Sequence, residues 1–494
     1  MSKHSVLELL IGGTSIRRLP TIGLPEPSSP LRYISTRARA PQLGFDDVLL
    51  SGLANDGGLY LPATWPQFSA TEIASFAGLD YPALAARIMA PFVEGSVLAK
   101  DLEGLTRQAY AGFTHSAVAP LKQLAANDWL VELFHGPTLA FKDYALQAVG
   151  LMFDRVLKAR GARITIVGAT SGDTGSAAIE ATKNKDAVDI FILHPEGRTS
   201  DVQRRQMTTV DAANVHNIAV RGTFDDCQDM VKAMFADEAF RNDIRLSAVN
   251  SINWARIMAQ VVYYFWAGVH VGAPQRAVAF SVPTGNFGNV FAGFVAQRMG
   301  LPVAKFIVGS NSNDILTRYF ETGAMTMSGV VPTLSPSMDI QVSSNFERLL
   351  FESMGRDGAA VSRLMDQFKQ SNGYAVPEAA HREMLKHFAG QRLDDKGTTR
   401  VISEIYRETG ELIDPHTAVG VYAGRHAGLD RGIPRLTLAT AHPAKFPAAV
   451  EAATGIYPPL PQALTDLFDR KERFTTLNND LSEVKAFVRQ HARR

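Results

Sequence analysis

The sequence contains one cysteine, Cys227, among its 494 residues. A single thiol excludes an intramolecular disulfide and any metal site built from several cysteines. Cys227 lies in the segment FDDCQDMVKAMF, whose pattern predicts a helix, so we expect a buried free thiol rather than a nucleophile. Sparse cysteine is typical of a reducing compartment, and we expect the chain to be cytoplasmic.

The sequence also lacks an excess of charge of one sign. Its 50 Lys and Arg residues nearly balance 49 Asp and Glu residues, which leaves a formal net charge of +1. No apolar run reaches the length of a membrane span, and Glu8 interrupts the short apolar patch near the N-terminus. A balanced charge gives no field that attracts nucleic acid or an anionic membrane. We therefore expect neither kind of partner.

What is present is an ordinary globular composition, with 46% apolar and 20% charged residues, and a length that allows two or three domains. Residues 1–32 end in a stretch rich in Pro and Ser and are predicted to form a loosely ordered N-terminal arm. Residues 33–116 contain helical patterns broken by Pro82 and Pro91, which predict a small α-rich N-terminal domain.

Residues 117–494 follow a different rhythm, in which apolar β-branched strands alternate with amphipathic helices. The predicted strands are Trp129–Phe134, Arg163–Val167, Val188–Leu193, Val215–Val220, Ala277–Val282, Val303–Val308 and Leu436–Ala439. The predicted helices include Lys142–Arg160, Ser176–Lys183 and 200–209, and the tail beyond Thr465 is predicted to be exposed helix. This alternation predicts an α/β fold with parallel sheets covered by helices on both faces. Ligands of such sheets bind at the carboxyl ends of strands, so the loops that follow the strands are the places to search.

The first candidate is Lys142, in the stretch His135–Gln147 (HGPTLAFKDYALQ). Partial burial lowers the pKa of a lysine and makes its amine a usable nucleophile and base. Taken alone, the stretch favours an ordinary lysine that packs its stem on apolar surface and pairs with Asp143. Two glycine-rich loops further along the chain favour the reactive amine instead.

The first of these loops is Gly168–Gly175 (GATSGDTG), between the predicted strand RITIV and the helix that follows. A helix N-terminus with small residues presents backbone N–H groups to an anion, and Thr170, Ser171 and Thr174 add hydroxyls. An N-capped turn would need only one or two such residues. We interpret the loop as an anion site.

The second loop is TGNFGN, whose residues Gly285, Asn286, Phe287, Gly288 and Asn289 precede a predicted helix. Two glycines allow close approach, and the N–H groups could ring a phosphate. The loop lacks the GxGxxG spacing of a dinucleotide site, so a monophosphate fits better. A glycine-bearing turn without a ligand is the alternative.

Three further stretches contain polar residues at the ends of elements. Thr440, at the end of a predicted strand in TLATAHPAKF, could face a neutral ring nitrogen, although a satisfied strand-end threonine is also consistent. His442 and Lys445 nearby are either anion contacts or surface residues. NSINWAR and SSNFER each place Ser, Asn and Arg at the start of a helix, and simple N-caps account for the Ser and Asn but not for the Arg. The candidates for a second anion site are Ser251, Asn253, Arg256, Asn345 and Arg348, together with Ser171 and Thr174.

One lysine, one phosphate loop and one hydroxyl-rich loop are what a pyridoxal 5'-phosphate site requires. The motifs HGPTLAFKD, GATSGDTGSAA, NSINWARI, SVPTGNFGN, SSNFERLL and TAHPAKF, in this order, resemble the threonine synthase family of the bacterial and fungal type. The N-terminal YISTR and GLANDGGLYLP resemble the small leading domain of that family.

The resemblance implies the tryptophan-synthase-β-like fold (fold type II of the pyridoxal phosphate enzymes), with a two-lobed catalytic domain over residues 117–494. It implies the lyase reaction that converts O-phospho-L-homoserine and water into L-threonine and phosphate, in threonine biosynthesis. By the same resemblance, Lys142 forms the Schiff base, Gly285–Asn289 hold the cofactor phosphate and Thr440 meets the pyridine nitrogen. Asp173 stands where many relatives in the wider superfamily have an Asn that contacts the cofactor, so its carboxyl could be protonated, turned away or bound differently.

Two other functions are consistent with the sequence. A serine or threonine dehydratase on the same fold would need no second anion site, because its substrate has no phosphate. A non-catalytic sensor of a phosphate ligand would keep the loops and need no amine at position 142. The oligomeric state, monomer or homodimer, is left open.

Overall fold

The computed structural model describes residues 30–170, 172–247 and 250–493, and the residues from Leu31 onward form one compact unit. The predicted arm, residues 1–32, therefore lies outside the described residues except for its last three. The domain boundary between residues 116 and 117 stays a prediction.

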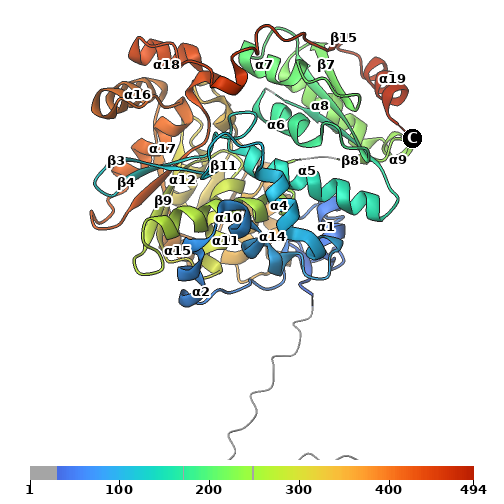
Figure 1. Cartoon of the computed structure of the whole chain (residues 1–494). Coiled ribbons are helices and arrows are strands. Elements are labelled where there is room, and N and C mark those ends of the chain that lie inside the picture. The colour runs from blue at the N-terminus through green and yellow to red at the C-terminus, as the bar shows by residue number, and fades with distance from the viewer. Residues whose placement is uncertain (1–29, 171, 248–249, 494) are drawn as a thin grey trace, which may run out of the picture. The chain divides into compact units, whose positions relative to one another are not determined.

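A five-stranded parallel sheet carries the order β15-β7-β6-β5-β8. Its strands are β5 (Ile164–Ala169), β6 (Val188–Pro195), β7 (Val215–Arg221), β8 (Leu246–Ser247) and β15 (Thr475–Asn478). One face packs on α8 (Phe224–Ala236), α9 (Glu238–Asp243) and α19 (Leu481–His491), and the other packs toward α5 (Lys142–Ala159), α6 (Asp173–Thr182) and α7 (Asp201–Thr208). All eight residues of β6 are buried, as expected for a strand covered on both faces. Figure 1 shows these helices on both sides of β7 and its neighbours.

The second large sheet has six strands in the order β13-β10-β9-β14-β4-β3. They are β3 (Leu121–Ala125), β4 (Asp128–Glu132), β9 (Val278–Pro283), β10 (Val303–Ser310), β13 (Phe388–Arg392) and β14 (Arg435–Ala439), all parallel except for the β3–β4 pair. The helices α16 (Asp395–Thr409), α17 (Pro415–His426) and α18 (Pro447–Thr454) lie on one side, and α10 (Trp254–His270), α11 (Gly288–Arg298) and α12 (Ile315–Thr322) on the other.

Residues 31–110 add an α-rich layer. It contains the antiparallel pair β1 (Tyr33–Ser35) and β2 (Tyr60–Pro62), with α1 (Phe45–Ser51), α2 (Ala70–Ser75), α3 (Tyr81–Met89) and α4 (Leu102–Tyr110). Its core is continuous with α10, because the Trp254 ring lies 6.2 Å from Tyr33 and 5.7 Å from Phe92. The helix α10 is buried over almost its whole length, which explains its nearly uninterrupted apolar sequence. Other elements are α13 (Phe346–Ser353), α14 (Gly358–Ser371) and α15 (Glu378–His387), with the antiparallel pair β11 (Ala324–Thr326) and β12 (Gly373–Ala375).

The predicted α/β class and all seven predicted strands are confirmed, and Cys227 is a buried free thiol on α8. The prediction of an exposed helical tail is wrong in part. Residues Thr475–Asn478 extend the five-stranded sheet as β15, and Val484 and Val488 of α19 are fully buried against it. Among the described residues, no helix is long and apolar enough to cross a membrane.

Candidate active site

The loops after β4 and β5 lead into Lys142 and Asp173, the loop after β9 is TGNFGN, and Thr440 follows β14. The backbone N–H of Phe141 donates to the carbonyl oxygen of Thr440 at 2.9 Å, and Ala140 and Ala441 form an isolated bridge. These contacts fix the start of α5, where Lys142 is the first residue, beside the carboxyl end of β14. Segments almost 300 residues apart in the sequence thus meet at one place.

Lys142 is only 9% exposed, and its Nζ lies 3.4 Å from a carboxylate oxygen of Asp173. Burial lowers the pKa of this amine; Asp173 acts in the opposite direction, and the charges of Lys445 and Arg256 lower it further. Asp143 is not the partner of Lys142, since its carboxylate accepts from the backbone and hydroxyl of Thr138 at 2.8 and 2.6 Å. A buried amine with a lowered pKa has the properties that covalent amine chemistry needs.

Asp173, the first residue of α6, is almost completely enclosed and tightly bound. Its carboxylate lies 2.8 Å from Nζ of Lys445 and accepts from Nε2 of Gln203 at 2.9 Å. Burial alone would raise the pKa of Asp173, but the charges of Lys445 and Lys142 hold it well below its usual value. The carboxyl therefore points inward, between Lys445 and Lys142, and the outward-turned alternative of the sequence analysis does not occur. The direction of the pKa shift favours the ionised form over the protonated one.

Lys445, whose placement the sequence analysis left undecided, lies at the candidate site. It is fully buried, and its Nζ also donates to the carbonyl of Thr138 at 2.7 Å. With two fixed oxygen partners, Lys445 is held far more tightly than Lys142, whose one polar side-chain contact in the described chain is the longer contact to Asp173. Gln203 and Thr138 were not predicted as site residues. Gln203 lies in no motif that the sequence analysis identified, and Thr138 lies in the stretch before Lys142 but acts through its backbone carbonyl, which no residue type indicates.

The TGNFGN loop joins β9 to α11, and hydrogen bonds to its backbone carbonyls fix its conformation. Phe287 has a left-handed backbone with φ of 62°, Ser343 Oγ donates to the carbonyl of Gly285 at 2.7 Å, and Asn345 donates twice to the carbonyl of Asn286. Within the described chain, no protein acceptor faces the backbone N–H groups of residues 285–289. A Cβ at Gly285 would lie 2.7 Å from the carbonyl oxygen of Ser337, so only glycine fits this position.

Asn289 continues the loop into the buried core. Its side-chain oxygen accepts from the hydroxyls of Tyr263 and Tyr264 at 2.6 and 3.0 Å, and its Nδ2 is buried without a partner among the residues that the structure describes. A buried amide N–H without an acceptor costs free energy unless a ligand satisfies it. The loop therefore offers backbone N–H groups and one side-chain donor to an anion.

Arg256, on the first turn of α10, is 3% exposed, yet its Nε and Nη1 have no partner in the described part of the chain. Burial lowers its pKa to about 10, so it stays charged near neutral pH. A buried guanidinium is expensive without a counter-ion. The charge of Arg256 is also one of the causes that lower the pKa of the Lys142 amine.

Arg348 is the opposite case. It is fully buried, and it donates to the carbonyls of Tyr60 at 2.7 Å and Ile252 at 2.7 Å, and to the side-chain oxygen of Asn345. These contacts join β2, the segment before α10 and the start of α13. They favour a supporting role, and the prediction that Arg348 binds the substrate stays untested.

Some of the other predicted residues are bound within the protein, and the side chains of others have no partner among the described residues. Asn253 caps α10 by accepting from the N–H of Ala255 at 2.9 Å and donates to the carbonyl of Leu49, and the carbonyl of Ser251 accepts from Asn345. Thr174 lies on α6 directly after Asp173. Thr440 is 6% exposed, and its hydroxyl makes no hydrogen bond within the described residues. Ser171 lies outside the described residues.

A pH-dependent prediction follows from Asp143. Burial raises its pKa to about 6, despite the opposing hydrogen bonds from Thr138. A carboxyl whose pKa is raised on folding stabilises the fold most below its unfolded pKa, near 4, and this contribution is lost as the pH rises through about 6. We expect Asp143→Asn, which mimics the neutral form, to gain about 1–3 kcal/mol relative to the unaltered chain between about pH 4.5 and about pH 7.5. Urea unfolding at both pH values measures this change, and a pH-independent difference would contradict it.

The residues present fit a phosphate-bearing aldehyde cofactor. The glycine loop offers unpaired N–H groups and the unpartnered Nδ2 of Asn289 to a phosphate. Lys142 supplies a buried amine with a lowered pKa to an aldehyde, and Thr440 supplies a free hydroxyl.

Comparison with known proteins agrees with this fit. Residues 116–439 match the family model described as pyridoxal-phosphate dependent enzyme, so the chain belongs to this class of enzyme and uses pyridoxal phosphate. Residues 32–110 match the model of the threonine synthase N terminus, and residues 417–488 match that of the threonine synthase C-terminal region. The chain belongs to the threonine synthase family.

Individual relatives are similar over nearly their whole length. A threonine synthase of Pseudomonas aeruginosa is 57% identical over 465 residues, which is 94% of this chain and 99% of the relative. The crystal structure of pyridoxal-phosphate-bound threonine synthase from Brucella melitensis is 54% identical with a TM-score of 0.93, and covers 94% of this chain and 100% of its own. The yeast threonine synthase structure is 38% identical with a TM-score of 0.89, over 94% of this chain and 99% of its own. The predicted family and the fold type are therefore confirmed.

Proposed function

We propose that the chain is a threonine synthase, a carbon–oxygen lyase that converts O-phospho-L-homoserine and water into L-threonine and phosphate. The observation that carries this proposal is that Nε and Nη1 of Arg256 are buried without a partner among the described residues, in a chain that belongs to the threonine synthase family. The charge of Arg256 also acts on the amine of Lys142. The substrate has a phosphate at one end and an α-amine at the other. Its site therefore needs a cation that binds the phosphate, next to the centre that reacts at the amine end. The proposed location is the cytoplasm.

When bound, the cofactor withdraws electrons from the substrate carbons, so that protons can leave Cα and Cβ. Lys142 supplies the amine that holds the cofactor aldehyde and, once displaced by the substrate, takes and returns the Cα proton. Its pKa, lowered mainly by burial, makes the neutral amine available for this step. Asp173, held ionised by Lys445, keeps a compensating negative charge beside Lys142 in its protonated form.

We assign the cofactor phosphate to Gly285–Asn289 and the pyridine nitrogen to the hydroxyl of Thr440. A hydroxyl, unlike a carboxylate, leaves that nitrogen without a proton. We assign the substrate phosphate to Arg256, with Thr174 and Ser171 at the neighbouring loop. Asn253, Asn345 and Arg348 act as the frame that holds the loop and the start of α10, as their contacts within the protein support.

The single most direct test is the release of phosphate. Purified chain loaded with pyridoxal phosphate should convert O-phospho-L-homoserine to equal amounts of threonine and phosphate. A dehydratase would instead release ammonia from serine or threonine, and a sensor of a phosphate ligand would bind phosphohomoserine without turnover. The unpaired Arg256 favours the synthase over the dehydratase, because the substrate of a dehydratase offers that cation no phosphate.

Cofactor affinity should depend on the space at Gly285. We expect Gly285→Ala to weaken pyridoxal phosphate binding by about 10- to 100-fold, since the new Cβ would force the backbone at Ser337 and Met338 to move. Fluorescence titration of the cofactor-free chain measures the change. Gly329→Ala is the matched control, because a Cβ at Gly329 meets nothing within 4 Å. Equal affinities for pyridoxal phosphate in the two variants would contradict the assignment of the cofactor phosphate to this loop.

A further inference from the structure

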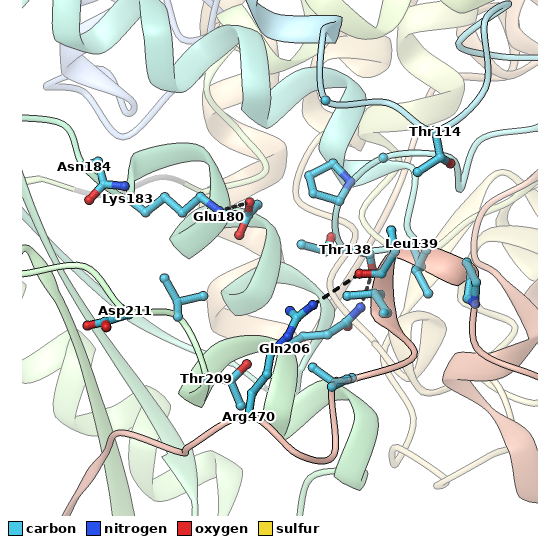
Figure 2. Close-up of a pocket in the computed structure, with 18 residues that line it drawn as sticks. Thr114, Thr138, Leu139, Glu180, Lys183, Asn184, Gln206, Thr209, Asp211 and Arg470 are labelled. Carbon is cyan, nitrogen blue, oxygen red and sulfur yellow. Dashed lines mark hydrogen bonds and ion pairs between the residues drawn. The ribbon is translucent and has the colours of Figure 1, made fainter.

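A second pocket, of about 350 Å³, lies next to the reactive centre but does not include Lys142. The segment Gly136–Leu139 forms one wall, the end of α6 and residues 183–184 form another, and α7, residues 209–211 and the stretch Pro461–Arg470 complete it. Figure 2 shows Glu180, Lys183 and Asn184 on one side of this pocket and Thr138, Leu139 and Gln206 on another. The proposed reaction uses none of the side chains that line it.

The pocket contains polar groups that the protein leaves unsatisfied. Gln206 is 6% exposed, and its Oε1 is buried without a hydrogen-bond partner in the part of the chain that the structure describes. Arg470 binds Asp466 and the carbonyl of Ala463 through Nε and Nη2, which leaves Nη1 without a protein acceptor in the described chain. A ligand that both donates and accepts would satisfy these two groups.

The remaining lining sets the chemical class of the ligand. The charges are balanced, with Lys183 and Arg470 against Glu180 and Asp211, so a multiply charged phosphate has no advantage. The apolar part consists of Pro137, Leu139, Val210, Pro461, Leu464 and Leu467, which a sugar would not fill. An α-amino acid with an aliphatic side chain carries an ammonium and a carboxylate on one carbon, next to an apolar body. We propose that this pocket binds a free aliphatic α-amino acid, with the ammonium on Oε1 of Gln206 and the carboxylate on Arg470.

A ligand there would be connected to the reactive centre by hydrogen bonds. Nε2 of Gln206 donates to the carbonyl of Thr138 at 3.2 Å, and that carbonyl also accepts from Lys445. Lys445 in turn holds Asp173, which faces Lys142. Leu139, in the pocket wall, has a φ of 60°, a conformation rarely adopted by residues with a side chain and often found in segments that switch. Occupation of the pocket therefore acts on the segment that leads into Lys142.

Binding is best measured by calorimetry with L-leucine as the probe, on full chain whose cofactor has been fixed to Lys142 by borohydride. This reduction blocks the reactive amine, so that L-leucine cannot react there. We expect saturable, equimolar binding, weakened at least about tenfold when the probe is 4-methylpentanoate, which lacks the ammonium, or isoamylamine, which lacks the carboxylate. Cofactor-free chain should bind L-leucine as well, which separates this result from the proposed threonine synthase reaction.

Two variants decide where L-leucine binds. Gln206→Met should weaken binding about tenfold. Gln297→Met is the matched control and should leave binding unchanged, because Gln297 also donates to a backbone carbonyl, that of Val303, and also has a buried Oε1 without a partner, but lies on α11 outside the pocket. An absence of saturable binding, or equal affinities for L-leucine in the two variants, would refute the proposal that this pocket binds an amino acid. L-leucine should also slow hydrogen exchange at residues 136–142, and unchanged exchange despite binding would overturn the connection to Lys142.

Discussion

Replacing Lys142 with alanine should abolish threonine synthesis, with a loss of about 10⁴-fold in turnover. The variant loses both the amine that bonds to the cofactor and the base at the substrate Cα. It should also lose the visible absorbance that borohydride removes in the unaltered chain. Mass spectrometry after borohydride treatment locates the bond, which we expect on Lys142 alone.

The nearby Lys445 makes this test demanding. Both lysines face Asp173, at 3.4 Å for Lys142 and 2.8 Å for Lys445. Lys445 is fully buried and also bound to the carbonyl of Thr138, so its amine is not free to react. The Lys142→Ala chain should therefore form no reducible bond at Lys445, and added methylamine should restore part of the turnover. A reducible bond at Lys445 in this variant would refute the assignment of Lys142.

Arg256→Met should lower kcat/KM for O-phospho-L-homoserine by about 10²- to 10³-fold and at the same time stabilise the fold by about 1–3 kcal/mol. Both effects have one cause. Two nitrogens of the guanidinium, Nε and Nη1, are buried without a partner in the described residues, so the folded chain without substrate bears their desolvation cost. The substrate phosphate offsets that cost on binding. Steady-state kinetics and urea unfolding of the cofactor-loaded chain measure the two effects.

Arg348→Met is the matched control, because Arg348 is just as buried but bound to backbone carbonyls. Removing it leaves the carbonyls of Tyr60 and Ile252 without donors, so we expect a loss of about 3–5 kcal/mol of stability. The two arginine variants thus change stability in opposite directions. If Arg256→Met also destabilised the chain and left KM unchanged, Arg256 would be a structural residue and not the phosphate ligand.

Much of the fold could be predicted because its strands are short, β-branched and apolar, bounded by glycine or polar turns. β6 is buried at every position and has the sequence VDIFILHP, so its period and length already indicate a strand covered on both faces. β8 and β15 were missed for physical reasons. Two residues of β8 pair with β5, and the sequence TTLN of β15 has a single buried side chain, so tertiary pairing rather than local preference makes them strands.

The site was predictable where a residue type is unusual in its local sequence, as Lys142 is among apolar neighbours. What could not be predicted is which charges are paired. Arg256 and Arg348 occupy similar positions in similar motifs, yet one is unpaired and the other is bound to Tyr60, almost 290 residues earlier in the chain. Lys445 likewise depends on contacts with Thr138 and Asp173, which no local pattern contains.

The position of β14 in the sheet has a consequence for how the chain folds during translation. This strand is made near the end of translation, yet it lies between β9 and β4 in the middle of the six-stranded sheet. A nascent chain on the ribosome therefore has β4 and β9 complete but no strand to join them until residues 435–439 emerge. From the completion of β9 until β14 is made, these apolar edges are unpaired, and unpaired strand edges are the surfaces that chaperones protect from aggregation.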